Sequence, residues 1–203
     1  MPDCFSVEAA AKDIIARLVS NLTPFDDLER QHIQETLTWI HQGKMPLFRL
    51  QKSDIPPKHL VVYFVVWDED AKKILLVDHK KAQLWLPAGG HVELNEHPRL
   101  AVLRECREEL SIEADFWHDD PLFLTSTVTG DLTPGHIDVS LWYVVKGHAY
   151  QPLSFDLREF NAVQWFALDQ IPYAKPDPHM KRFVEKWGKL LSNDAVNHCC
   201  LDV

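Results

Sequence analysis

The stretch LPAGGHVELNEHPRLAVLRECREELSI, residues 86–112, decides the fold. Its two adjacent glycines, Gly89 and Gly90, predict a tight turn ahead of a helix. We expect the helix to start at Pro98, because a proline suits the first turn, where its missing N–H needs no partner. One side of this predicted helix is apolar and is formed by Leu103, Cys106 and Leu110.

The other side of the predicted helix carries carboxylates, because Glu105, Glu108 and Glu109 stand at positions i, i+3 and i+4. Like charges at this spacing destabilise a helix, so folding alone gives little reason for them. A divalent cation would remove the repulsion, and magnesium takes oxygen ligands while keeping positions for water and substrate phosphates. Arg104 and Arg107 leave a second interpretation open, in which they neutralise the glutamates in a solvated surface network.

Composition limits the class of protein. With 203 residues, of which 46% are apolar, the chain is long enough for one core plus an extension. A formal net charge of −9 argues against binding to a nucleic-acid polymer, which needs a basic face. The sequence shows neither a signal-peptide pattern nor an apolar run that could span a membrane. The cysteines lack the spacing of a disulfide framework, so we expect reduced thiols in a soluble, cytoplasmic protein without a membrane partner.

The pattern of the chain changes near residue 55. Before it, the spacing of apolar residues predicts two helices, with Ser6 and Thr23 as their N-caps. Two consecutive prolines follow, which cannot continue a helix and mark a boundary. The sequence thus predicts a helical N-terminal extension over residues 1–55 and a second domain over residues 56–203.

After this boundary most segments have the composition and alternation of strands. They are residues 60–67, 73–79, 122–129, 137–145 and 162–168. Residues 178–192 return to helical spacing. Strands that flank one acidic helix, with another helix at the end, indicate an α/β or α+β sandwich.

The spacing of several residues in the deciding stretch is specific. Gly90, five residues, Glu96, seven residues and then residues 104–112 (RECREELSI) closely resemble the signature of the Nudix hydrolases. Ser111 stands where that pattern has glycine, and Cys106 stands where it usually has an aliphatic residue. A small apolar thiol is an acceptable replacement at the second position.

The resemblance implies both a fold and a reaction. Over roughly residues 58–172 it implies a Nudix-type α/β/α sandwich with a mixed sheet, preceded here by the small helical extension. The family implies a magnesium-dependent hydrolase, with Mn²⁺ as an alternative ion. Such an enzyme cleaves the diphosphate linkage of a nucleoside diphosphate derivative or related small molecule by attack of a metal-activated water. Dimers are frequent in the family, which favours a homodimer.

The resemblance also implies which residues hold the metal. Glu105, Glu108 and Glu109 would bind one or more ions that activate water and offset charge on the diphosphate oxygens. Arg104 would orient these glutamates by a salt bridge rather than touch the substrate. The general base varies in position within the family, and we place it on the same glutamate cluster.

Residues around the double glycine are expected to meet the substrate or support the site. Gly89 and Gly90 would let the backbone turn sharply and approach the metal or the phosphates closely. Glu96 would support the loop and the start of the helix, and Glu93 is a further candidate ligand or base. His91 follows the glycines directly, so we include it among the substrate-binding residues without a defined role.

Four other side chains have two interpretations each. His136 and Asp138 would point to the same side of a strand, either into the cleft or as a structural pair. Trp85 and Trp142 could stack on a base, although an aromatic side chain in a strand more often belongs to the core.

Two rival functions share the expected fold. One is a Nudix domain that senses a nucleotide without cutting it, but such domains typically lack the metal glutamates that this chain keeps. The other is an isomerase of isoprenyl diphosphates, which needs a catalytic cysteine in a different strand context. Cys106 lies on the apolar side of the predicted helix, which argues against the second rival.

Overall fold

The computed structural model describes residues 4–43, 46–51, 55–129 and 136–199. In chain order the elements are α1 (Cys4–Ser20), α2 (Asp27–Gln42), β1 (Lys58–Asp68), β2 (Lys73–His79), β3 (Leu84–Leu86), β4 (Ala88–His91), α3 (Pro98–Leu110), β5 (Asp115–Phe116), β6 (Phe123–Thr129), β7 (His136–Lys146), β8 (Phe160–Ala167) and α4 (Met180–Cys199). Within the described residues, no helix combines the length and apolarity that a membrane crossing requires.

The strands form one mixed sheet around β1. Strand β1 runs parallel to β7 and antiparallel to β2 and β4. Strands β5 and β6 pair with β7, and β3 and β8 pair with β2, all antiparallel. The register of the central parallel pair places His59 opposite Asp138 and Leu60 opposite Val139.

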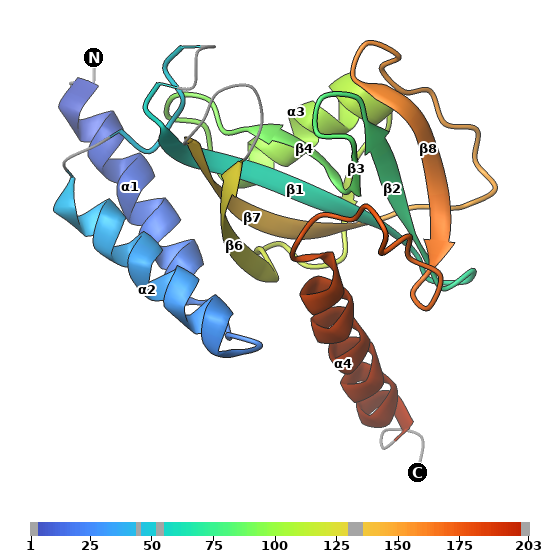
Figure 1. Cartoon of the computed structure of the whole chain (residues 1–203). Coiled ribbons are helices and arrows are strands. Elements are labelled where there is room, and N and C mark those ends of the chain that lie inside the picture. The colour runs from blue at the N-terminus through green and yellow to red at the C-terminus, as the bar shows by residue number, and fades with distance from the viewer. Residues whose placement is uncertain (1–3, 44–45, 52–54, 130–135, 200–203) are drawn as a thin grey trace.

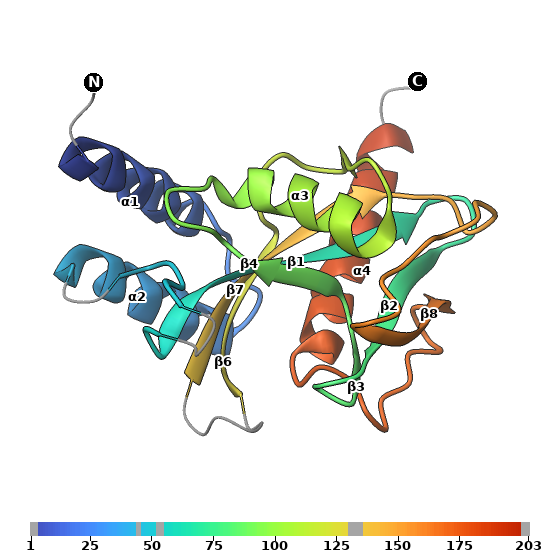
Figure 2. The ribbon, with the colours of Figure 1, turned by 90° about the horizontal axis from the view of Figure 1, so that it is seen from above.

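The two faces of the sheet are covered by different helices, as Figures 1 and 2 show for α3 and α4. Alternate residues of β1 point to opposite faces, as the pleat of a strand requires. The apolar residues of β1 that share a cluster with α3 are Leu60, Val62, Phe64 and Val66. Those that share a cluster with α4 are Val65 and Trp67. The predicted α/β/α sandwich with a mixed sheet is therefore confirmed.

Helices α1 and α2 lie side by side at one end of the sheet (Figure 1). Their buried side chains, including Ile15, Ile33 and Trp39, belong to the same apolar cluster as β1 and α3. Leu47 and Phe48, on the connection to β1, are also buried there. The N-terminal segment is thus packed into the main core, and removing it would expose apolar surface of the sheet.

Most predicted elements match the structure, but both predicted N-caps are wrong. Helix α1 begins at Cys4, ahead of Ser6. Helix α2 is capped by Asp26 rather than Thr23, because the Asp26 carboxylate accepts a hydrogen bond from Glu29 N at 2.8 Å. The short strands β3, β4 and β5 were not predicted, since two to four residues give too little alternation to detect.

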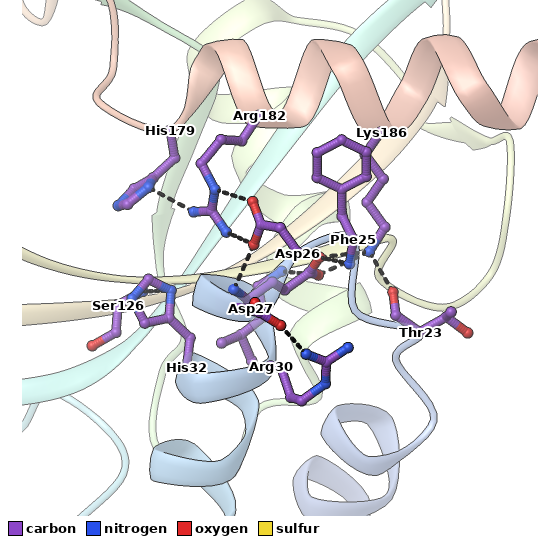
Figure 3. A network of polar contacts seen from close by, with 12 residues as sticks. Thr23, Phe25, Asp26, Asp27, Arg30, His32, Ser126, His179, Arg182 and Lys186 are labelled. Atoms are coloured by element: carbon purple, nitrogen blue, oxygen red, sulfur yellow. Dashed lines mark hydrogen bonds and ion pairs between the residues drawn. The ribbon is translucent and has the colours of Figure 1, made fainter.

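A polar network fastens the start of α2 to α4 and β6 (Figure 3). Arg182 donates two hydrogen bonds to the Asp26 carboxylate, which lowers the pKa of Asp26 to about 2. Behind this pair, Lys186 Nζ lies 2.8 Å from Glu29 Oε1, and both side chains are buried. The same Glu29 oxygen accepts from Leu124 N at 3.2 Å. Three elements far apart in the sequence therefore meet at one buried ion pair.

Breaking this buried pair should destabilise the whole molecule. We expect Glu29→Gln to lower the free energy of unfolding by about 3 kcal/mol, because it leaves the Lys186 ammonium buried without a counter-charge. Adding Lys186→Met to that variant should recover much of the loss. Urea denaturation of the four members of the cycle measures the coupling.

The matched control is the exposed pair on the same helix. Asp27 and Arg30 interact at the solvent-facing side of α2, where the Asp27 side chain is 99% exposed. We expect Asp27→Asn to change stability by less than about 0.5 kcal/mol. Equal losses in Asp27→Asn and Glu29→Gln would contradict a special contribution from the buried pair.

Candidate active site

Helix α3 buries carboxylates and apolar residues on the same side. Its fully buried apolar residues are Ala101, Val102, Cys106 and Leu110. At 3.6 residues per turn, Glu105 and Glu109 fall inside the arc that these residues define, and both are buried. The prediction of opposite apolar and acidic sides is therefore wrong for these two glutamates, although Glu108 does face solvent. Leu103 lies at the edge of the buried arc and is only half-buried.

The double glycine makes room for a carboxylate instead of forming a turn. Gly89 and Gly90 lie within strand β4, and among the described glycines only Gly43 has a positive φ. A Cβ on Gly90 would lie 2.1 Å from Glu105 Oε1, and one on Gly89 would lie 2.0 Å from the carbonyl oxygen of Val62. The predicted sharp turn is thus wrong, whereas the predicted close approach is present in the structure.

Arg104 positions the glutamates as the sequence predicts. Its guanidinium donates to both carboxylate oxygens of Glu96 at 2.9 and 3.1 Å, and to Glu105 Oε1 at 2.5 Å. A fourth bond runs to the carbonyl oxygen of His91 at 2.9 Å. These contacts, the Glu96 bonds first, raise the pKa of Arg104. Glu96 also accepts from Glu93 N at 2.9 Å, so it supports the loop before α3.

The two buried glutamates are held close to each other's negative charge. Burial raises the pKa of Glu105. Burial, followed by the charge of Glu105, raises the pKa of Glu109 to about 9, although Gly89 N donates a hydrogen bond to it at 2.8 Å. Burying like charges is costly unless a proton or a cation compensates them.

A hard divalent cation fits this donor set. The three glutamates of α3 line one hollow and offer carboxylate oxygens, which magnesium and manganese prefer. The missing Cβ of Gly90 leaves the space that the Glu105 carboxylate occupies. The candidate ligands are Glu105, Glu108 and Glu109, and a cation among them would offset the repulsion that burial intensifies.

Two adjoining hollows surround the glutamates. The larger, about 560 Å³, is lined by Gly90, His91, Glu93, Arg104, Glu105 and Glu108, together with Arg49, Leu50, Gln51, Val92, Leu94 and Glu159. The smaller, about 280 Å³, is lined by all three α3 glutamates with Asp156, Arg158 and Glu159. The predicted site residues other than Gly89 and Glu109 thus share one cavity, and Glu109 borders the hollow beside it.

Among the lining residues that sequence reasoning missed, two bring charge to the larger hollow. Glu159 is exposed and borders both hollows from the loop before β8, where Asp156 N is bonded to the carbonyl oxygen of Glu109 at 3.0 Å. Arg49 lies on the connection between α2 and β1. Neither residue belongs to a spaced motif, so only the folded chain shows their proximity to α3.

Trp85 and Trp142, the two candidates for base stacking, pack against other aromatic side chains. Trp142 is fully buried, stacks on Phe183 with ring centroids 5.1 Å apart and donates to Thr125 Oγ1 at 2.9 Å. A base-stacking role for Trp142 is therefore wrong. Trp85 is half-buried and packs edge-to-face against Phe166, and neither hollow includes it among its lining residues.

The family assignment follows from a sequence comparison. The NUDIX domain model matches residues 57–187, well over half of the chain. The chain belongs to the NUDIX domain family. The matched span extends past the region of resemblance expected from the sequence and into α4. No curated protein matches the chain.

Solved structures of low sequence identity share the fold. A MutT NUDIX hydrolase from Burkholderia pseudomallei is 22% identical, with a TM-score of 0.52, covering 64% of this chain and 97% of that one. An Ap4A hydrolase from C. elegans is 18% identical, with a TM-score of 0.55, covering 66% and 98%. The NUDIX domain of Shewanella oneidensis NrtR, solved with ADP ribose, is 20% identical, with a TM-score of 0.53, covering 65% and 87%.

Alanine substitutions at Gly90 and Gly89 test whether the space at Gly90 serves the Glu105 carboxylate. We expect Gly90→Ala to keep the fold but reduce turnover at least tenfold, because its methyl group displaces the Glu105 carboxylate, the mobile end of a side chain. Gly89→Ala meets the backbone of β1 and should lower the melting temperature instead. Melting curves and rates for both variants separate the two effects. Normal activity in a folded Gly90→Ala variant would contradict this account.

Ser111 ends α3 in the left-handed conformation, with φ 53° and ψ 36°. Ser111 N donates to the carbonyl oxygen of Arg107 at 3.2 Å, which is the bond of an αL C-cap, and Ile112 N donates to that of Cys106 at 3.1 Å. We expect Ser111→Gly to raise stability by about 1 kcal/mol and leave turnover within a few-fold. Thermal unfolding checks the first effect, and a lower melting temperature would count against it.

Proposed function

We propose that this protein hydrolyses the diphosphate linkage of a nucleoside diphosphate derivative or a related small molecule, with Mg²⁺, or Mn²⁺ in its place, held by Glu105, Glu108 and Glu109. The observation that carries the proposal is that these three glutamates line one hollow, with a strand glycine leaving space for the Glu105 carboxylate. An acidic cavity repels a diphosphate, so a bridging cation is required for binding.

The chain's own residues have distinct tasks in this proposal. A bound divalent ion supplies Lewis-acid activation of water and offsets charge on the diphosphate oxygens. Arg104 holds Glu105 and Glu96 in place and is a positioning residue. The sequence led us to expect the general base within the α3 glutamate cluster. Because those glutamates are assigned to the metal here, we propose Glu159, which borders both hollows, as the group that accepts a proton from water, with Glu93 as the second candidate. Arg49 brings a cation to the cavity wall and is the candidate contact for a substrate phosphate.

Adenine nucleotides with a diphosphate bridge are the first substrates to test. The structural relatives include a hydrolase of Ap4A and a domain solved with ADP ribose. A screen of dinucleotides, nucleoside diphosphate sugars, triphosphates and coenzymes with Mg²⁺, followed by phosphate-containing products, tests both the reaction class and the substrate.

A nucleotide sensor is the alternative function. Binding without turnover of any diphosphate compound under Mg²⁺ or Mn²⁺ would favour it. The retained glutamates argue for hydrolysis, since a sensor has no need to bury Glu105 and Glu109 at the energetic cost described above.

The boundary near residue 55 separates the family fold from an added segment, and we propose that residues 1–55 and 56–203 share one cooperative core. The buried ion pair and the common apolar cluster support this view. A single unfolding transition for the full chain is expected. The homodimer stays a prediction from the family.

Removing one ligand charge tests the metal site. We expect Glu108→Gln to reduce turnover at least about 100-fold, because loss of a metal ligand should cost no less than loss of its supporting partners. The side chain of Glu108 is 59% exposed, so the fold should persist, and metal-free stability should hold or rise as repulsion is relieved.

Glu113→Gln is the matched control. Glu113 is an exposed carboxylate just beyond the same helix, paired with Arg107 at 2.6 Å, and borders neither hollow. We expect its rates to stay within two-fold of the unmodified protein, on the order of a surface ion pair. Near-normal turnover in Glu108→Gln, or an equal loss in Glu113→Gln, would overturn the ligand assignment.

A further inference from the structure

A second group of metal-binding side chains gathers on the strands beside the glutamates. It consists of His59 on β1, His91 on β4 and Asp138 on β7. One ligand atom from each residue lies within 4.8 Å of the others. His136 adjoins the group, with its ring stacked on that of His59 at a centroid separation of 5.5 Å. We name His59, His91 and Asp138 the histidine cluster.

The histidine cluster lies on the opposite face of the sheet from the α3 glutamates. In the ladder between β1 and β4, Gly90 is opposite Val62 and His91 is opposite Val61. Neighbouring residues of a strand point to opposite faces, and Gly90 points toward Glu105 on α3. The side chains of His91 and His59 therefore belong to the other face, where Asp138 is the register partner of His59. His91 also lines the larger hollow, and its backbone carbonyl oxygen accepts from Arg104 on that side.

The hydrogen bond of His59 Nδ1 determines the protonation state of its Nε2 in the neutral ring. Its Nδ1 lies 2.9 Å from the carbonyl oxygen of Pro56, which can only accept, so Nδ1 carries a proton. In the neutral ring Nε2 is then an acceptor, and it lies 3.1 Å from Asp138 Oδ1. Two electron-rich atoms at this distance repel each other unless a positive charge, either a second ring proton or a metal ion, compensates them.

We propose that the histidine cluster binds one divalent transition-metal ion, with zinc preferred, at a site separate from the α3 glutamates. Two imidazoles and a carboxylate are a set that zinc accepts, with a fourth position left for water or another donor. A hydrogen bond from the far ring nitrogen to a carbonyl oxygen, as His59 makes to Pro56, is typical of histidines that bind metals. Magnesium disfavours such a nitrogen-containing set.

Burial and strand register prepare the site for an ion. His59 is fully buried, and Asp138 and His91 are half-buried. The ligands come from three hydrogen-bonded strands, so their backbones are fixed before any ion arrives. The His59 and His91 rings approach with centroids 4.8 Å apart. Protonation of both rings would place two cations side by side, whereas one metal ion can be bound by both rings.

The experiment is a titration of the full-length, metal-free protein with Zn²⁺, followed by calorimetry. It is made in a Cys199→Ser/Cys200→Ser background, which removes neighbouring thiols near the C-terminus, and with His148→Ala, which removes a surface group of Asp68, Asp70 and His148. With excess Mg²⁺ present to fill the α3 glutamate site, we expect one equivalent of Zn²⁺ to bind, and we expect Asp138→Asn and His91→Gln each to weaken binding at least about tenfold. Glu108→Gln should leave Zn²⁺ binding unchanged.

Cobalt supplies a spectroscopic check that needs no activity. Co²⁺ added to the same protein should give visible absorption of a nitrogen- and oxygen-bound ion, and Zn²⁺ should abolish it while excess Mg²⁺ should not. If Asp138→Asn fails to fold, His91→Gln and the Co²⁺ spectrum decide. Absence of Zn²⁺ binding, binding indifferent to both variants, or binding lost in Glu108→Gln would each overturn the proposal. The first result would assign the compensating charge to a proton on His59.

Discussion

The burial of two carboxylates against strand β4 is the constraint on which the site depends. Glu105 and Glu109 point into the interface between α3 and the sheet, among side chains that are otherwise apolar. Arg104 compensates part of the charge on Glu105, and Gly89 N compensates part of that on Glu109. Burial, followed by the negative charge of Glu105, still raises the pKa of Glu109 to about 9. A bound cation would relieve this unfavourable electrostatic energy.

The N-terminal helices stabilise the same core on which the site is built. Their apolar side chains complete the cluster that backs β1, and the buried pair of Glu29 and Lys186 fixes α2 against α4. Arg49, which follows α2 in the chain, lines the cavity. A segment outside the family match thus contributes to both the core and the cavity.

Sequence reasoning predicted what is repeated or locally spaced, and it failed where tertiary contacts decide. The continuous apolar runs of β1 and β2 and the spacing from Gly90 to Glu109 were enough to predict the strands, α3 and its ligand candidates. The role of Gly90 was misjudged, because a turn and a close approach both call for glycine and only the position of Glu105 distinguishes them. Asp26 replaces the predicted cap for a similar reason, since its pairing with Arg182 joins positions far apart in the chain.

The register of β4 links the two polar clusters of the molecule. Pairing of Gly90 with Val62 places a residue without a side chain beneath α3, which leaves room for the Glu105 carboxylate. The same pairing directs the His91 side chain to the other face, beside His59. A slip by one residue would exchange these faces, bringing an imidazole onto the Glu105 carboxylate and leaving a glycine where the histidine cluster needs a donor. Only one register places Gly90 against Glu105 and His91 against His59. The side-chain contacts on the two faces of β4 (Ala88–His91) therefore help to determine its register, together with its backbone hydrogen bonds.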